Sequence, residues 1–265
     1  MQFIRHLLLA IQFFTRIPVT GRLGAWVGFS PAMLRASAAH FPAVGWVVAA
    51  VAGSVFAGLL MGLPPTHTAP WVAAIACTVA SVWLTGGFHE DGLADTADGL
   101  GGHVSRERAL EIMKDSRIGA YGAMALVLAL LMKVSLLALL GEADPTLALV
   151  ALVCAHVFSR FVPLVLIRVL PHVGDAAGSK SKPLADQISM SALGVAAFWC
   201  VPAFVLSLWA VPDLTLVAGW LGAMVAGIWM ARLLAVRLQG FTGDGLGATQ
   251  QVCEIAFYLA VALAF

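Results

Sequence analysis

The chain has 265 residues, of which 61% are hydrophobic and 11% are charged, and its mean hydropathy is +0.94. Soluble globular domains are about 45–50% apolar and about 25% charged, so this composition excludes an ordinary water-soluble domain. Fifteen basic and fourteen acidic residues leave a net charge of +1, which excludes the strongly basic surface typical of nucleic-acid-binding proteins. We expect a membrane protein without a nucleic-acid partner, organised as a single domain over residues 1–265.

The first predicted element is an amphipathic helix within residues 1–17. At about 100° per residue its polar side chains fall within roughly a 120° sector, and no small-x-small cleavage site follows its apolar stretch. We expect this helix to lie in the cytoplasmic interface of the membrane; the alternatives are an additional span and a signal peptide. The polar sector contains Gln2, Arg5, His6, Gln12 and Arg16.

Apolar windows of about 20 residues, long enough to cross a bilayer as a helix, follow along the chain. The predicted fold class is all-α, a polytopic membrane helical bundle of about seven transmembrane helices. The windows lie near residues 41–62, 69–88, 118–140, 146–169, 188–211, 214–236 and 246–265.

The distribution of Lys and Arg predicts how these spans are oriented, because both residues collect in cytoplasmic loops. Connections 63–68, 141–145 and 212–213 contain neither residue. The N-terminal 40 residues contain Arg, the segment 170–187 contains Lys, and the segment 89–117 contains both. We therefore expect the N-terminus and every long polar loop in the cytoplasm, and the C-terminus outside.

The segment after the second window is unusually acidic, with four carboxylates between residues 90 and 98. If it is helical, Asp91, Asp95 and Asp98 stand at i, i+4 and i+7 and share one face. Like charges at this spacing destabilise a helix, and nearby glycines weaken it further. The stripe therefore needs a compensating cation, and oxygen ligands favour Mg²⁺ over zinc. The alternative is a solvated acidic face.

A second acidic element is predicted as a short helix that starts at Ser105 as its N-cap. Its carboxylates repeat at i, i+4 and i+8 and can face the first stripe. Lys114 and Arg117 would supply positive charge to phosphate oxygens. The alternative is a cytoplasmic helix surface covered with salt bridges. The carboxylates are Glu107, Glu111 and Asp115.

Motifs over nearly the whole chain point to one family. They are HEDGLADTADG at 89–99, MKDSRIGAYG at 113–122 and FTGDGLGA at 241–248, supported by FFTRIP at 13–18 and FPAVG at 41–45. Together they resemble the signatures of the cobalamin 5′-phosphate synthases, also called adenosylcobinamide-GDP ribazoletransferases.

The resemblance implies a multi-pass enzyme of the bacterial inner membrane that acts late in cobalamin biosynthesis, with its active site on the cytoplasmic face. Such an enzyme uses Mg²⁺ to displace GMP from adenosylcobinamide-GDP with a ribose hydroxyl of α-ribazole or of its 5′-phosphate. Besides these substrates and membrane lipid, its partners could include a second copy of the chain or other enzymes of cobalamin assembly.

A second, incomplete resemblance bears on mechanism. Asp95-x-x-Asp98-Gly99 followed by Glu111-x-x-x-Asp115 is similar to the paired-aspartate motif of the CDP-alcohol phosphotransferases. Here no Ala-Arg pair follows the first aspartates, Glu111 replaces an aspartate, and Glu107 stands where a glycine is usual. The resemblance therefore implies a carboxylate-bound metal and leaves the identity of the general base open.

Phosphoryl transfer depends mostly on positioning and electrostatics, and the predicted site is assigned on that basis. We expect Mg²⁺ to be held by Asp91, Asp95 and Asp98, with Glu111 from the second element. Asp115 completes the metal shell or accepts the hydroxyl proton, while Lys114 and Arg117 bind phosphate. Glu90 is assigned to substrate binding.

Charged residues inside the apolar windows are further candidates, because a charge costs at least about 2.5–3.5 kcal/mol at that depth. Arg160, with His156 one turn earlier, either binds a substrate phosphate or pairs structurally with Glu254. Glu254 is itself a candidate substrate-binding residue. Lys133 is similarly placed, but it can snorkel or pair internally, and we leave it outside the site.

Two polar loops complete the candidate set. The loop at 174–182 could cradle nucleotide phosphates through Ser179, Lys180 and Lys182; the alternative is ordinary cytoplasmic positive charge. Thr242 and Asp244 open the last window, where they either contact substrate or serve in the N-terminal turn of a helix.

Two other classes of function remain open. One is another membrane enzyme of the CDP-alcohol phosphotransferase type. The other is a transporter of a corrinoid or another anion, which would place broken helices and charges near the midplane, often in repeated halves. The acidic cluster at one membrane face and the lack of an evident sequence repeat favour the transferase.

Overall fold

A computed structural model describes residues 1–174, 188–211 and 214–265. Within these ranges the regular structure is helical, apart from one isolated parallel bridge between His172 and Phe241. The helices are α1 (Gln2–Phe14), α2 (Gly21–Val27), α3 (Pro31–Ser37), the 3₁₀ turn η1 (Ala38–His40), α4 (Phe41–Gly62), α5 (Ala69–Thr85), α6 (Phe88–Gly101), α7 (Arg106–Ile112), α8 (Ala120–Ala143), α9 (Pro145–Phe158), α10 (Val162–Val169), α12 (Met190–Ala210), α13 (Thr215–Leu238) and α14 (Gly243–Ala264).

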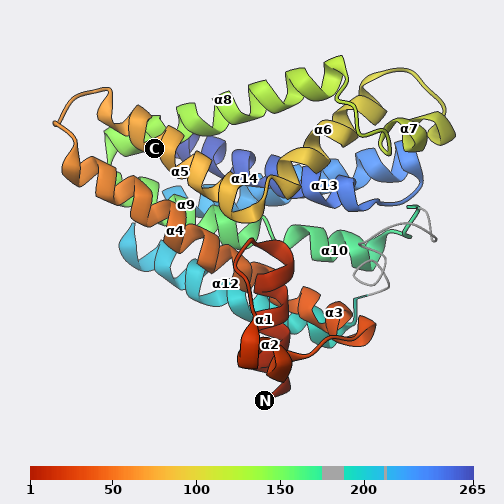
Figure 1. The fold of residues 1–265 in the computed structure, drawn as a ribbon. Coiled ribbons are helices and arrows are strands. Elements are labelled where there is room, and N and C mark those ends of the chain that lie inside the picture. Colours follow the sequence, from red (N-terminus) through yellow and green to blue (C-terminus); the bar gives the residue numbers. More distant parts are fainter. Residues whose placement is uncertain (175–187, 212–213) are drawn as a thin grey trace.

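The prediction of an all-α, multi-pass membrane bundle is confirmed. Six helical stretches among the described residues are long and apolar enough to cross a membrane, and a seventh span results if α5 and α6 are counted together. The long helices run roughly parallel, with the α4–α5 connection and the C-terminus at one end and α6 and α7 toward the other (Figure 1). The six stretches are 31–62, α8, 145–169, α12, α13 and α14.

The second window does not form one straight helix to residue 88. The chain turns by 90° between α5 and α6, because Gly86 and Gly87 adopt φ angles of +79° and +74°. Glycine reaches this left-handed region without the steric cost that a Cβ atom imposes. This elbow, Gly86–Gly87, ends α5 and changes the direction of the chain before the acidic helix α6 begins.

The fourth window is also broken, into α9 and α10, although together they are long enough to span. Pro163 lies at the start of α10, and a proline inside a continuous helix would remove one backbone hydrogen bond and clash with the preceding turn. The break leaves Ser159 and Arg160 in the interior, both almost fully buried.

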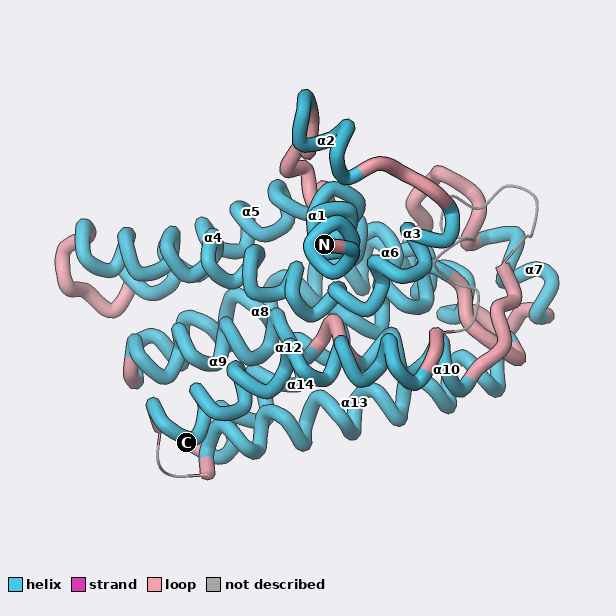
Figure 2. Tube along the Cα trace, turned by 90° about the horizontal axis from the view of Figure 1, so that it is seen from below, coloured by secondary structure: helices cyan, strands magenta, loops and turns pink. Residues whose placement is uncertain are grey.

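The N-terminal segment forms the predicted helix, α1, whose axis runs across the long helices (Figures 1 and 2). It buries Leu9, Ala10 and Phe14 and packs against α2, α3, α4 and η1. The sequence did not predict α2 and α3, which are short. A position of α1 in the membrane interface stays a prediction.

Helix α14 organises the bundle, because it packs against α6, α8, α9, α10 and α13. Small residues permit this close packing. Gly219 of α13 lies against the ring of Phe257, and a Cβ atom at Gly222 would come within 2.9 Å of the Ala256 carbonyl. The acidic helix α6 is thereby held between α14 and α8, which decides what surrounds its carboxylates.

Candidate functional site

The acidic segment is helical, as predicted, and Asp91, Asp95 and Asp98 all lie on α6. Asp91 is exposed, whereas the other two are half-buried. Partial burial, together with the charges of Asp244, Asp91 and Asp98, raises the pKa of Asp95 to about 7. Burial and like charges thus favour the protonated form of Asp95, and the cation site stays a prediction.

Asp244 joins this stripe from a distant part of the sequence. It lies in the first turn of α14, and a Cβ atom at Gly92 of α6 would stand 2.8 Å from its carbonyl oxygen. The glycine therefore lets the two helices approach closely. Thr242, predicted to bind substrate, is the N-cap of α14, where its hydroxyl accepts a hydrogen bond from the Gly245 amide at 3.1 Å.

Asp98 differs from its neighbours on the stripe because its carboxylate already has two backbone partners. It accepts hydrogen bonds from the amides of Gly119 at 2.7 Å and Gly122 at 2.8 Å. A Cβ atom at either glycine would overlap the carboxylate. Asp98 therefore caps the N-terminus of α8 and ties α6 to the loop that precedes α8. A carboxylate has further lone pairs, so its role as a metal ligand stays a prediction.

The second acidic element is shorter than predicted. Ser105 is its N-cap and accepts a hydrogen bond from the Arg108 amide at 3.3 Å, but α7 ends at Ile112. Asp115 therefore lies in the turn beyond the helix, and the predicted repeat at i, i+4 and i+8 is wrong for it. The sequence had no strong stop signal here, and α7 packs against α6 and α13.

Asp115 and Arg117 form a close ion pair, with 2.6 Å between Nη2 and Oδ2. The Arg117 side chain is largely exposed. Its hydrogen bonds hold the pKa of Asp115 at about 2, so Asp115 is a weak base while this pair persists. Glu111 pairs with Arg108 at 2.9 Å, as the alternative of a salt-bridged surface proposed. Lys114 lies on the same exposed turn.

Asp98, Glu111 and Asp115 nevertheless line one cleft, of about 360 Å³, together with Arg108 and Arg117. The two acidic elements do therefore share a cavity. Within the described part of the chain, no three His, Cys, Asp or Glu side chains are close enough to hold a metal by themselves. The four predicted metal ligands, Asp91, Asp95, Asp98 and Glu111, therefore do not form such a group in the structure.

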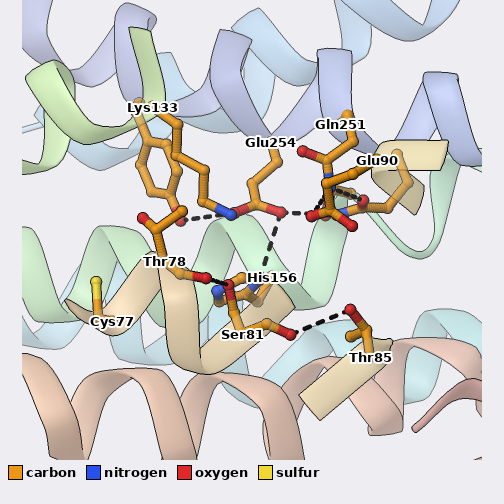
Figure 3. Close-up of polar contacts among 12 residues, drawn as sticks. Cys77, Thr78, Ser81, Thr85, Glu90, Lys133, His156, Gln251 and Glu254 are labelled. Atoms are coloured by element: carbon orange, nitrogen blue, oxygen red, sulfur yellow. Dashed lines mark hydrogen bonds and ion pairs between the residues drawn. The ribbon is translucent and has the colours of Figure 1, made fainter. Parts of the chain in front are cut away.

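The remaining predicted residues inside the spans belong to a second, buried polar cluster (Figure 3). Its centre is Glu254, which forms an ion pair with Lys133 at 2.6 Å and lies 3.4 Å from His156. Gln250 and Tyr258 also donate hydrogen bonds to Glu254, at 2.7 and 3.3 Å. The structural alternative of an Arg160–Glu254 pair is corrected accordingly, because the direct partner of Glu254 is Lys133.

Arg160 and Glu90 extend this cluster toward α6. Arg160 donates to the His156 carbonyl at 2.8 Å and lies over the ring of Phe41. Glu90 accepts a hydrogen bond from Gln251 at 3.0 Å. Both side chains are almost fully enclosed, so Glu90 points into the bundle rather than along the acidic stripe. The predicted site residues therefore form two groups, an exposed site of carboxylates and an interior set of paired charges.

Sequence reasoning missed several members of the buried cluster. The missed members include Gln250 and Tyr258, which recur with the predicted Glu254 at every fourth residue on α14 and form a helical face of polar groups inside an apolar window. That periodicity was the available signal. No sequence signal indicated that Lys133 pairs with this face, because the two helices are far apart in sequence.

Ser179, Lys180 and Lys182 lie outside the described residues. The chain just before that loop is attached to the motif around Thr242. The amide of Val173 donates to the Phe241 carbonyl at 2.9 Å, and the amide of Phe241 donates to the Pro171 carbonyl at 2.9 Å.

The comparisons with known proteins agree on one family. The family model described as cobalamin-5-phosphate synthase matches residues 6–262. Proteins named adenosylcobinamide-GDP ribazoletransferase are similar over most of their length. Those of Polaromonas naphthalenivorans and Albidiferax ferrireducens are each 60% identical over 99% of both chains. That of Shewanella piezotolerans is 42% identical over 95% of this chain and 92% of its own.

No solved structure matches the sequence. The family match nevertheless covers the acidic stripe of α6, the turn with Asp115 and Arg117, and the first turns of α14. The chain therefore belongs to the cobalamin-5-phosphate synthase family.

Proposed function

We propose that this chain transfers the phosphocobinamide group of adenosylcobinamide-GDP to a ribose hydroxyl of α-ribazole, or of its 5′-phosphate, and releases GMP. The reaction would depend on Mg²⁺. The names of the relatives supply the donor and the acceptor class. The observation that carries the proposal is the meeting of the α6 stripe with Asp244 of α14, which crowds negative charge around Asp95.

Asp91 and Asp95 would hold the metal, with Asp244 and Asp98 nearby. A bound Mg²⁺ would neutralise charge on the pyrophosphate during transfer. The ion needs substrate oxygens to complete its shell in this arrangement, so metal and donor would bind together. The pairing of Asp98 with two amides keeps the stripe and the α8 loop in one position.

Arg117 and Asp115 have a role that follows from their ion pair. The Arg117 guanidinium is exposed and can reach phosphate oxygens, which match its planar donor geometry. When Arg117 turns to phosphate, Asp115 loses the hydrogen bonds that lower its pKa. Asp115 then becomes a better acceptor for the hydroxyl proton of the ribose. Lys114, on the same turn, would add a second phosphate contact.

The buried cluster would hold helices rather than touch substrate. Glu90, Arg160 and Glu254 are enclosed and are joined to α14 or α9 by the bonds described above. Their predicted substrate-binding role would require an opening of the bundle. We infer that they fix α6 against α14, so that the exposed carboxylates keep their spacing.

The proposed location is the bacterial inner membrane, with the acidic stripe on the cytoplasmic face. The multi-pass character of the chain comes from its apolar helices. The side follows from the positive-inside distribution of Lys and Arg. The donor contains a water-soluble nucleotide and the acceptor is a water-soluble nucleoside or nucleotide, which suits a site at the membrane surface.

The proposal is tested with the purified protein in detergent. GMP release from adenosylcobinamide-GDP should require both Mg²⁺ and α-ribazole or its 5′-phosphate, and the two acceptors should be compared at equal concentration. Asp95→Asn should abolish release, while Glu107→Gln, on the exposed face of α7, should leave it unchanged. Release without added metal after chelation would contradict the Mg²⁺ requirement. Uptake of a labelled corrinoid by proteoliposomes without GMP release would favour the transporter.

A further inference from the structure

A groove runs between α5 and α8 on the outside of the bundle. Its volume is about 500 Å³, and apolar side chains form most of its lining. They include Ile75 and Val79 of α5 and Leu130 and Val134 of α8. Val79 is 61% exposed, and α8, on the other side of the groove, is long and apolar enough to cross a membrane. The groove therefore opens toward the lipid rather than toward the protein interior.

One end of the groove is charged. Arg16, from the segment after α1, lines it beside Trp83 and the glycines of the elbow. Its backbone amide donates to the Leu84 carbonyl at 2.7 Å, so the residue is held at the end of α5. Tryptophan is enriched where a membrane meets water. The charged end of the groove therefore lies at the level of lipid head groups.

The Arg16 side chain is exposed and has no hydrogen bond or ion pair with any residue in the described ranges. Its guanidinium lies against the elbow, since a Cβ atom at Gly86 would be 3.1 Å from Nε. An unpaired cation at the head-group level, continuous with an apolar groove, is complementary to a molecule with an anionic head and a hydrocarbon tail.

We propose that this groove binds an anionic phospholipid, with the phosphate on Arg16 and one acyl chain between α5 and α8. A zwitterionic lipid would bring its own cation next to the guanidinium, which lowers the electrostatic gain. Bound in this way, the lipid would contact α5, α8 and the elbow, Gly86–Gly87. The site would thus place a lipid against the elbow, which sets the direction of the acidic helix α6.

A competing explanation is that Arg16 only stabilises the C-terminal end of α5, where a cation interacts favourably with the helix dipole. That effect needs no lipid. It predicts that loss of Arg16 lowers stability equally in every membrane. The lipid proposal predicts a loss that depends on lipid charge, so the two explanations separate in one experiment.

The test uses the full chain in nanodiscs of phosphatidylcholine, with and without phosphatidylglycerol, and measures the melting temperature and lipid affinity. Phosphatidylglycerol should raise the melting temperature of the unaltered chain. Arg16→Gln should lose this response, with affinity reduced about fivefold, as expected for about 1 kcal/mol per basic residue at an anionic surface. Arg22→Gln removes an exposed arginine of α2 outside the groove and should keep the response.

A second variant tests the apolar part of the groove. Val79→Trp should fill it and weaken phosphatidylglycerol binding, whereas Val225→Trp, at another exposed position on α13, should not. An equal response of Arg16→Gln and the unaltered chain would overturn the proposal. So would an equal loss of stability in phosphatidylcholine alone, or a matching stabilisation by inorganic phosphate. None of these readouts uses the transferase reaction, so they stand apart from the proposed function.

Discussion

At the scale of single residues, two aspartates one turn apart on α6 have different surroundings. Asp98 accepts two hydrogen bonds from backbone amides at the start of α8. Asp95 is surrounded by other carboxylates. The same residue type therefore serves as a helix cap in one position and as a site of concentrated negative charge in the other.

The first prediction concerns the space around Asp98. Gly122→Ala places a Cβ atom against the Asp98 carboxylate, so we expect a loss of about 1–3 kcal/mol in stability from overpacking. Chemical denaturation or thermal melting in detergent measures it. Gly194→Ala is the control, because nothing lies within 4 Å of its Cβ position on α12. Equal effects of the two substitutions would contradict the cap assignment.

The second prediction concerns pH. Because the pKa of Asp95 is raised to about 7, the native state keeps a proton that the unfolded chain has lost. Stability without metal should therefore fall as pH rises from about 4 to about 7. Mg²⁺ competes with this proton, so its stabilising effect should grow over the same change. Melting curves with and without Mg²⁺ measure both trends. Asp95→Asn should reduce both trends and leave the part due to Asp244, whose pKa burial raises to about 6; an unchanged pH dependence in that variant would count against the assignment.

The third prediction separates a phosphate contact from a metal contact. If Arg117 binds oxygens whose charge grows in the transition state, Arg117→Ala should lower kcat roughly 10²-fold, for a loss of about 2.7 kcal/mol. If it binds the ground state equally well, KM should rise instead. Added Mg²⁺ should not restore this variant, whereas Asp91→Glu should respond to higher Mg²⁺. Recovery of Arg117→Ala by Mg²⁺ alone would make Arg117 an organiser of the metal site.

At the scale of elements, the packing of α14 against α8 encloses charges that neither helix could bury alone. Lys133 and Glu254 are at most 2% exposed and 2.6 Å apart. The pair removes two charges from water, which is costly, and the surrounding hydrogen bonds from Gln250 and Tyr258 offset part of that cost. The buried pair therefore favours one relative position of α14 and α8.

The buried ion pair predicts that the stability effects of two substitutions are not additive. Lys133→Met and Glu254→Gln should each destabilise the protein by about 3–5 kcal/mol, because each leaves a partner unpaired in the interior. The double variant should be less destabilised than the sum of the two. Melting temperatures in detergent of the unaltered chain, the two single variants and the double variant measure these losses. Additive losses would mean that the two side chains do not interact energetically.

At the scale of the whole molecule, the two ends of the bundle differ in chemistry. The C-terminus lies at the end opposite α6 and α7 (Figure 1). The connections 63–68 and 141–145 at that end contain no Lys or Arg. Helix α6, with the acidic stripe, and α7, with the cleft, lie toward the other end (Figure 1).

The orientation of the whole chain is tested with reporter fusions. A reporter after Phe265 should read as extracytoplasmic, and one inserted at Gly101 as cytoplasmic, because basic residues collect on the cytoplasmic side. Protein levels of the two fusions serve as the control. The reverse pair of results would refute the predicted topology, including the proposed cytoplasmic site.

The sequence by itself determined the fold class, the approximate limits of the spans and the helical stripe of α6. These are local properties, since hydropathy and a period of 3.6 residues are read within one window. It also predicted the family, because the motifs are short and contiguous. The extent of α7 was missed, since Asp115 continues the helical spacing although the chain has already turned away.

The tertiary structure alone decided which charges meet. Asp244 reaches the α6 stripe, Lys133 pairs with Glu254, and Glu90 with Gln251, across large separations in sequence. From the sequence any buried cation could pair with any buried anion, because the choice depends on the rotation and depth at which helices pack. The two glycines of the elbow set the direction of α6, and that direction fixes the partners of its carboxylates.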